Sequence, residues 1–250
     1  MLTKQRFTAR ASVVTLTALL VAACDSDSGG QTVTPNPPPP PPPPAMASFD
    51  VTVTNLTNAQ PLSPVAVIAH DGSYSVFTLG MPATAGLETL AEGGDNSALI
   101  AEADADAAVI TTVSGAAPIG PGGNETVSFT LLESELPGLT VSVSTMLVNT
   151  NDAISGPNRV SIENLAVGDS VSVRSIAYDA GTEANSEEAI HIPGPAGGGE
   201  GFNAARDDIA DHVSMHQGVV GTEDGFATSD LNNQHRFDNA VTAVRIERTQ

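Results

Sequence analysis

Alternation of apolar and polar residues is the most regular pattern in the chain. It recurs over residues 49–54, 127–131, 139–144 and 171–173, and again over the last stretch, 240–248. A strand with one face in the core and one in water has this period of two, because successive side chains point to opposite faces of a sheet. Gly, Pro and Asn separate these stretches, as expected for strands joined by turns. The pattern predicts an all-β fold, an antiparallel β-sandwich of about eight strands.

Two further stretches carry a different pattern. Residues 63–70 read SPVAVIAH and are apolar at successive positions, which indicates a central strand buried on both faces. Residues 193–239 contain many Gly, Asp and Asn residues and few apolar ones, so we expect long C-terminal loops laid over the sheet. Loops of this length are more often functional than idle.

One segment has helical rather than strand spacing. Residues 83–107 are rich in Ala, Leu and Glu, and Gly93 and Gly94 provide a stop in the middle. Asp95 or Asn96 could cap a second helix that begins directly afterwards. We therefore expect two short helices covering one end or edge of the sandwich.

The N-terminus has the layout of a secretory signal. Lys4, Arg6 and Arg10 precede a short apolar run, residues 11–23, which is too short to span a bilayer as a stable helix. The run ends in VAAC, and these small residues before Cys24 resemble the lipobox of bacterial lipoproteins. The resemblance implies a signal peptide over 1–23, cleavage before Cys24, and a diacylglycerol attached to the Cys24 sulfur. Such a chain is held on a membrane by its lipid.

The residues after Cys24 predict a tether. Residues 24–48 have almost nothing to bury, and they include an unbroken run of eight prolines, 37–44. At ~3.1 Å per residue this run forms a polyproline II rod of about 25 Å. The remaining residues, 49–250, have the length of one domain. We expect a protein of the bacterial cell envelope, on the periplasmic face of the inner membrane or on the outer membrane.

Charge and cysteine content limit the classes of ligand and chemistry that we expect. Without residues 1–23 the chain keeps six of its nine Lys and Arg residues and all 29 Asp and Glu residues, a formal charge of −23. Such a surface repels nucleic acid and favours divalent cations. Cys24 is the only cysteine, so once lipidated it leaves no disulfide and no thiolate for zinc or catalysis.

Several motifs resemble the spondin N-terminal domain family. Residues 61–95 contain a strand ending in a histidine, an aromatic-Phe-x-x-Gly stretch and the sequence LAEGGD, marks carried by His70, Tyr74, Phe77 and Gly80. Residues 179–183 read DAGTE after a strand, and residues 146–156 read MLVNTNDAISG. The close of the chain, 218–248, is similar to bacterial members, so the resemblance covers residues 49–248.

The resemblance implies an eight-stranded β-sandwich related to the calcium-binding sandwich of membrane-targeting signalling domains. In animals the domain occurs in extracellular-matrix and adhesion proteins, with a calcium ion at one end. This chain has Ala153 where animal members place an aromatic residue after the loop aspartate, and it has none of their cysteines.

Oxygen ligands cluster after two of the predicted strands. Asp152 and Asp179 each follow a strand, so they could converge at one end of the sandwich, and Glu183 follows Asp179 across a turn that Gly181 permits. Calcium takes six to eight oxygen ligands, usually from adjacent loops. We therefore predict a Ca²⁺ site formed by Asp152, Asp179 and Glu183. The alternative is that these acids cap turns. Weaker metal candidates are Asp95, Asn149 and Glu187.

Two short patterns resemble a zinc site and a serine esterase. His212 and His216 have the i, i+4 spacing of a helical zinc pair, but Val213 stands where the catalytic pattern needs Glu, and we interpret them as loop histidines. Residues 168–170 read Gly-Asp-Ser, as in one class of esterases, yet no histidine has an Asp three residues before it to orient a base for Ser170. The sequence therefore predicts no enzyme.

The sequence favours a membrane-anchored envelope lipoprotein with a calcium-binding domain. We expect a non-catalytic binding or adhesion module that contacts an envelope or extracellular protein or a glycan, and no nucleic acid. Two alternatives stay open. One is a structural envelope protein whose acidic loops bind no metal, and the other is an envelope hydrolase that uses Ser170.

Overall fold

The computed structural model describes residues 40–205, 210–238 and 240–250 of the chain. Pro43–Gln250 forms one compact unit that contains both sheets and their cores. The predicted signal peptide 1–23, Cys24 and most of the tether lie outside the described residues. Within the described ranges, every helix is too short or too polar to cross a membrane.

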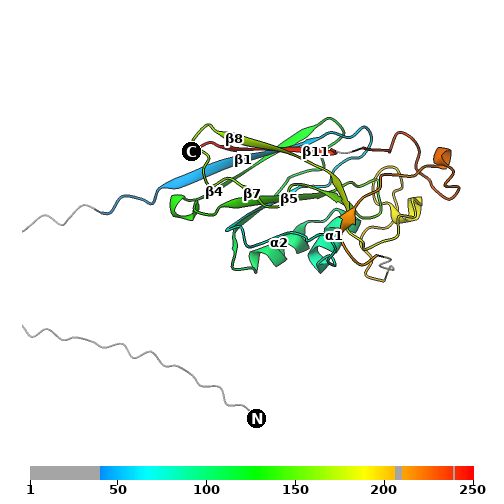
Figure 1. Cartoon of the computed structure of the whole chain (residues 1–250), viewed down its shortest axis with the longest axis horizontal. Coiled ribbons are helices and arrows are strands. Elements are labelled where there is room, and N and C mark those ends of the chain that lie inside the picture. Colours follow the sequence, from blue (N-terminus) through cyan, green and yellow to red (C-terminus); the bar gives the residue numbers. More distant parts are fainter. Residues whose placement is uncertain (1–39, 206–209, 239) are drawn as a thin grey trace, which may run out of the picture. The chain divides into compact units, whose positions relative to one another are not determined.

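The first sheet has four antiparallel strands in the order β4-β1-β11-β8 (Figure 1). These strands are β1 (Met46–Asn55), β4 (Asn124–Leu132), β8 (Ser170–Ser175) and β11 (Thr242–Arg248). The long strand β1 lies between β4 and β11. It begins at Met46, three residues before the domain start expected from the sequence.

The second sheet has seven strands in the order β10-β9-β6-β5-β2-β3, with β7 paired to β5. These strands are β2 (Ala66–His70), β3 (Val109–Ser114), β5 (Thr140–Met146), β6 (Ala153–Ser155), β7 (Val160–Ser161), β9 (Ala177–Asp179) and β10 (Ser214–Met215). The antiparallel sandwich expected from the sequence is confirmed. Eleven strands are described rather than about eight, because four of them have only two or three residues, too few for alternation to show.

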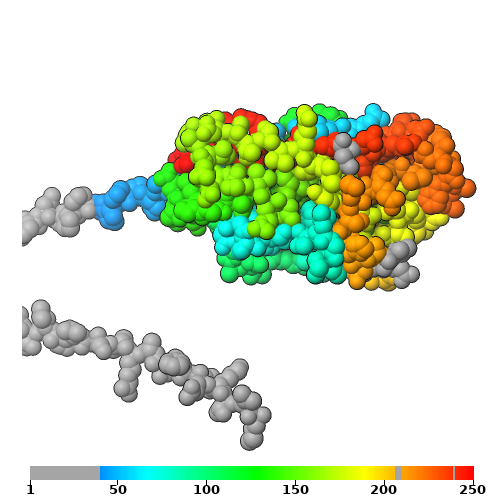
Figure 2. Space-filling model, viewed as in Figure 1, coloured from blue at the N-terminus to red at the C-terminus, as the bar shows by residue number. Residues whose placement is uncertain are grey.

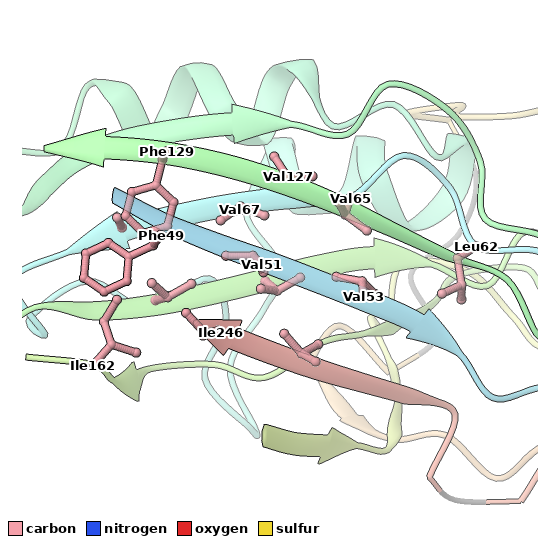
Figure 3. Close-up of a cluster of buried hydrophobic side chains, with 14 of the residues drawn as sticks. Phe49, Val51, Val53, Leu62, Val65, Val67, Val127, Phe129, Ile162 and Ile246 are labelled. Carbon is pink, nitrogen blue, oxygen red and sulfur yellow. The ribbon is translucent and has the colours of Figure 1, made fainter. Parts of the chain in front are cut away.

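The main core lies between the two sheets (Figure 3). Phe49, Val51 and Val53 of β1 are fully buried, as their alternation with polar residues predicts. The ring of Phe49 stacks on that of Phe129 with centroids 5.3 Å apart. Burying one such side chain contributes about 1.5–3 kcal/mol, so these strand faces hold the sheets together.

Two helices form a third layer on the outer face of the larger sheet, α1 (Ala85–Gly93) and α2 (Ser97–Asp104). Ala66 and Ile68 of β2 point toward them, which is why β2 is buried on both faces, as predicted. The helices therefore cover a sheet face, whereas the sequence led us to expect them at one end. Thr84 caps α1, and Gly94 at φ 71° ends it.

C-terminal loops were expected over 193–239, and their described residues, 193–205 and 210–238, cover one end of the sandwich, where they are coloured yellow to orange in Figure 2. A small cluster of Ile192, Val219 and Leu231 holds them together. Single 3₁₀ turns occur at Glu133–Glu135, Ala189–His191 and Thr222–Asp224.

Candidate cation site

Three short neighbouring strands bring three titratable side chains to one end of the larger sheet. Asp152 directly precedes β6, and Asp179 ends β9, which pairs antiparallel with β6 so that Ala153 lies opposite Asp179. On the other side of β9, β10 places Ser214 opposite Asp179, and His216 follows β10. Because antiparallel neighbours start and end at the same edge, residues far apart in sequence meet here.

The three side chains form a tight, buried group. One potential ligand atom from each of Asp152, Asp179 and His216 lies within 4.8 Å of the others. The residues are 0%, 8% and 4% exposed, respectively. Two carboxyl groups so close together and so far from water need compensation from protons, hydrogen bonds or a cation.

Hydrogen bonds among the described residues reach only one of the two carboxylate oxygens of Asp152. Its Oδ2 accepts hydrogen bonds from the backbone N–H groups of Thr182, at 2.9 Å, and Glu183, at 3.2 Å. Its Oδ1 is buried and has no hydrogen-bond partner in the part of the chain that the structure describes. Burial raises the pKa of Asp152 to about 7, and the neighbouring charge of Asp179 adds to this, while the two backbone N–H groups oppose it. The unpartnered oxygen is therefore available to an ion.

Asp179 is held by its own loop. Its Oδ1 accepts the N–H of Gly181 at 2.9 Å, and its Oδ2 accepts the side-chain amide of Asn185 at 2.6 Å. Gly181 has φ 76°, and a Cβ added there would lie 2.5 Å from the carbonyl oxygen of His212. The loop after β9 thus wraps the site only because glycine occupies this position.

Neither ring nitrogen of His216 offers a free lone pair in the neutral form. Its Nδ1 accepts the backbone N–H of Gly218 at 2.9 Å, so the proton of the neutral ring is on Nε2. That Nε2 is buried and has no hydrogen-bond partner among the described residues. Burial lowers the pKa of His216, and Asp179 opposes the shift. A nitrogen that carries a proton does not bind a metal, so the ligands that this group offers are oxygen atoms.

Glu183 lies next to this group without joining it. The residue is buried, its backbone binds Asp152, and its Oε2 accepts the side-chain amide of Asn151 at 3.4 Å. It lines a cavity of about 340 Å³ together with Asp179. Its carboxylate is not among the three ligand atoms that converge.

The weaker candidates have other roles in the structure. Asp95 is exposed and its Oδ1 accepts the N–H of Ser97 at the start of α2. Asn149 donates to the carbonyl of Ala59 and accepts from Ala196, which ties loops together. Glu187 lines a separate cavity.

His212 and His216 do not lie on one helix face, in agreement with their interpretation as loop histidines. His212 is exposed, His216 is buried, and strand β10 rather than a helix lies between them. Sequence reasoning did not select His216 for the site. The only signal was the pattern HVSMH, and a two-residue strand is too short to show which of its neighbours turn inward.

The comparisons agree with this architecture. A sandwich of two antiparallel sheets does not by itself define a function. The family model described as Spondin_N matches residues 55–190, more than half of the chain, and the chain therefore belongs to the spondin N-terminal domain family. This membership supports an extracellular or binding-type module. The match includes Asp152 and Asp179 and ends before His216. No curated protein matches the chain.

Proposed function

We propose that this protein is a cell-envelope lipoprotein, anchored through Cys24, whose spondin-type domain binds calcium and acts as a non-catalytic adhesion or binding module. The observation that carries the calcium proposal is the buried Oδ1 of Asp152, which has no hydrogen-bond partner among the described residues, in a side chain that lies beside Asp179. Leaving such a group uncompensated costs about 1–3 kcal/mol or more when it is charged. A divalent cation between the two carboxylates removes that cost.

The donor set favours calcium over zinc. Asp152 and Asp179 supply carboxylate oxygens, whereas the hydrogen bond from Gly218 occupies the lone pair of His216 Nδ1 and leaves Nε2 protonated. Zinc prefers nitrogen and sulfur ligands in four-coordinate sites, whereas calcium takes six to eight oxygens, including carbonyls and water. The adjoining cavity lined by Glu183 leaves room for water or for an oxygen ligand of a partner.

The surroundings of Ser170 do not favour the hydrolase alternative. That serine begins β8 and is exposed, and no hydrogen bond within the described ranges joins it to a histidine. Among the described residues, His191 Nδ1 lies 3.0 Å from Ser186 Oγ, and His70 Nε2 lies 3.0 Å from Ser142 Oγ, where both residues are fully buried. There Nδ1 accepts the N–H of Gly72, so Nε2 carries the proton and does not act as a base toward Ser142.

Calorimetric titration of Pro43–Gln250 with calcium tests the cation site. We expect saturable one-to-one binding that Asp152→Asn or Asp179→Asn weakens at least tenfold, because each removes a charged ligand. Asp238→Asn, at an exposed position, is the matched control and leaves the affinity within about twofold of the parent. No saturable heat in the parent chain would contradict the proposal.

Cross-linking on intact cells separates the binding module from a metal-independent structural protein. A calcium-dependent module loses its cross-linked partner when cells are treated with a chelator. A partner retained in constant stoichiometry with and without chelator would favour the structural alternative.

A further inference from the structure

A second cavity lies beside the cation site, at the same end of the molecule. It has a volume of about 270 Å³ and is lined by Asn185, Glu187, Gln217, Gly218, Val220 and Phe226. Four of these residues lie beyond the region that matches the family. Its volume is slightly below the ~300–1,000 Å³ of sites for drug-sized ligands, so it fits a ligand of only a few heavy atoms.

The carboxylate of Glu187 is the only charged group on the lining. Glu187 is 3% exposed, and its Oε1 accepts the backbone N–H of Val220 at 3.1 Å. No described residue donates a hydrogen bond to its second oxygen. Burial raises the pKa of Glu187 to about 7, and the N–H of Val220 opposes this shift. The cavity therefore contains a nearly buried acid with an oxygen free for a ligand.

The backbone at Glu187 is held in a conformation that a glutamate rarely adopts. Its φ is 56°, in the left-handed region. Two hydrogen bonds fix the residue there, one from its N–H to Asn151 Oδ1 at 3.3 Å and one from the N–H of Asp230 to its carbonyl at 2.8 Å. Strained backbone of this kind persists where the surroundings over-determine it and clusters at ligand sites. The glutamate held in this conformation lines the cavity.

We infer that this cavity binds a primary ammonium group carried on a short aliphatic chain. The carboxylate of Glu187 receives the ammonium, the amides of Asn185 and Gln217 offer further oxygen acceptors, and Val220 and Phe226 pack on the aliphatic part. An aromatic wall also suits a cation. Two kinds of ligand carry such an alkylammonium group: a free small amine, and the lysine side chain of a partner protein.

The lining disfavours the other ligand classes. A calcium ion needs more than the single carboxylate present here. An anion would meet both Glu187 and the field of a chain with a formal charge of −20. A purely apolar ligand would leave the free oxygen of Glu187 without a partner.

Asn185 links this cavity to the cation site. Its side chain lines both cavities and donates to Asp179 Oδ2 at 2.6 Å. An ion that repositions Asp179 therefore acts on a wall of the ammonium cavity through one hydrogen bond.

Titration of Pro43–Gln250 with n-butylammonium, followed by amide NMR shifts, tests the inference. We expect saturable shifts at Gln217, Gly218 and Val220 with a dissociation constant in the millimolar range, on the order of 1 mM. The uncharged analogue n-butanol binds at least tenfold more weakly. A lysine-containing peptide that binds more tightly than n-butylammonium, and loses this on Nε-acetylation, identifies a protein lysine as the source; a weaker peptide identifies a free amine.

Glu187→Gln and Glu188→Gln form a matched pair. The first keeps the shape and the oxygen that accepts from Val220 but removes the charge, and lowers the affinity for n-butylammonium at least tenfold. The second removes the neighbouring charge, whose side chain is 41% exposed, and changes the affinity less than twofold. Shifts that fail to saturate up to roughly 50 mM, or an unchanged affinity in Glu187→Gln, would overturn the inference.

Discussion

At the scale of single residues, opposing effects act on the Asp152 carboxyl group of the candidate cation site. Burial and Asp179 favour its protonated form, and hydrogen bonds from the backbone favour its ionised form. One carboxylate oxygen of Asp152 accepts two backbone N–H groups, and the other has no hydrogen-bond partner in the described part of the chain. Its folded-state pKa of about 7 is well above the 3.8 of an ordinary Asp, so between these pH values the folded protein binds a proton that the unfolded chain releases. The stability of the metal-free protein therefore falls as pH rises through this window.

Asp152→Asn is expected to have opposite effects with and without calcium. In chelator the variant escapes the cost of ionising a buried acid, so its melting temperature exceeds that of the parent at pH 8, and the gap narrows toward pH 5. One pKa unit corresponds to about 1.4 kcal/mol, so we expect a gain of about 1–3 kcal/mol at pH 8. In excess calcium the order reverses, because the variant has lost a ligand. Thermal melts at both pH values, with and without calcium, measure this, and the same order in all four conditions would contradict it.

Gly181→Ala tests the close approach of the loop to His212. The substitution places a methyl group 2.5 Å from a backbone carbonyl oxygen and also puts alanine at a positive φ. We expect a loss of more than about 2 kcal/mol in the free energy of unfolding and a weaker calcium affinity.

Gly168→Ala is the matched control for that prediction. Gly168 has φ 88°, and a Cβ added there meets nothing within 4 Å. Gly168→Ala is therefore expected to lower the free energy of unfolding only by the cost of alanine at a positive φ, about 1–2 kcal/mol, and to leave the calcium affinity unchanged. Equal losses in denaturant unfolding of the two variants would mean that the clash at Gly181 relaxes freely.

At the scale of elements, long strands were predictable and short ones were not. Residues 49–54 and 127–131 alternate cleanly because one face of each strand is buried against the opposite sheet, and both are strands in the structure. Strands β6, β9 and β10 have two or three residues, and hydrogen bonding to neighbours rather than their own pattern defines them.

The same contrast explains what sequence reasoning could say about the site. Asp152 and Asp179 were chosen because each follows an apolar stretch, and the structure places both at one edge. His216 meets Asp179 only through the pairing of β10 with β9, a contact between residues 37 positions apart that no local pattern encodes. The cavity around Glu187 depends in the same way on loops beyond residue 190.

Ile68→Ala tests the helical layer. Ile68 is fully buried between β2 and the helices, in the second core rather than in the core between the sheets. Truncation of a buried isoleucine costs about 2–5 kcal/mol. We expect a loss in this range by denaturant unfolding with calcium affinity retained, because the cation site lies on other strands. A loss of calcium binding in a folded variant would show that the helical layer also positions the site.

At the scale of the whole molecule, calcium is expected to raise thermal stability by mass action. A ligand at 100 times its dissociation constant adds about 2.7 kcal/mol to the free energy of unfolding. For a domain of about 200 residues each kcal/mol corresponds to roughly 2–4 °C, so we expect the melting temperature to rise by roughly 5–10 °C. Calorimetric scans with calcium and with chelator measure the shift. Magnesium at the same concentration is the control, because its demand for octahedral geometry disfavours a loop site.

Strand β1 runs from the tether to the opposite end of the domain, which determines how the domain would bear a pulling force. The tether enters at Met46, and the other end of β1 reaches the loop end of the sandwich, where Asn55 bonds Gln60 and Gln60 bonds Asn149 close to the cation loop (Figure 1). Along its length β1 pairs with β4 on one side and β11 on the other. If the proposed lipid anchor pulls against a partner held at the loops, the force runs along this strand. The hydrogen bonds of both strand pairs are then loaded together in shear instead of opening one after another.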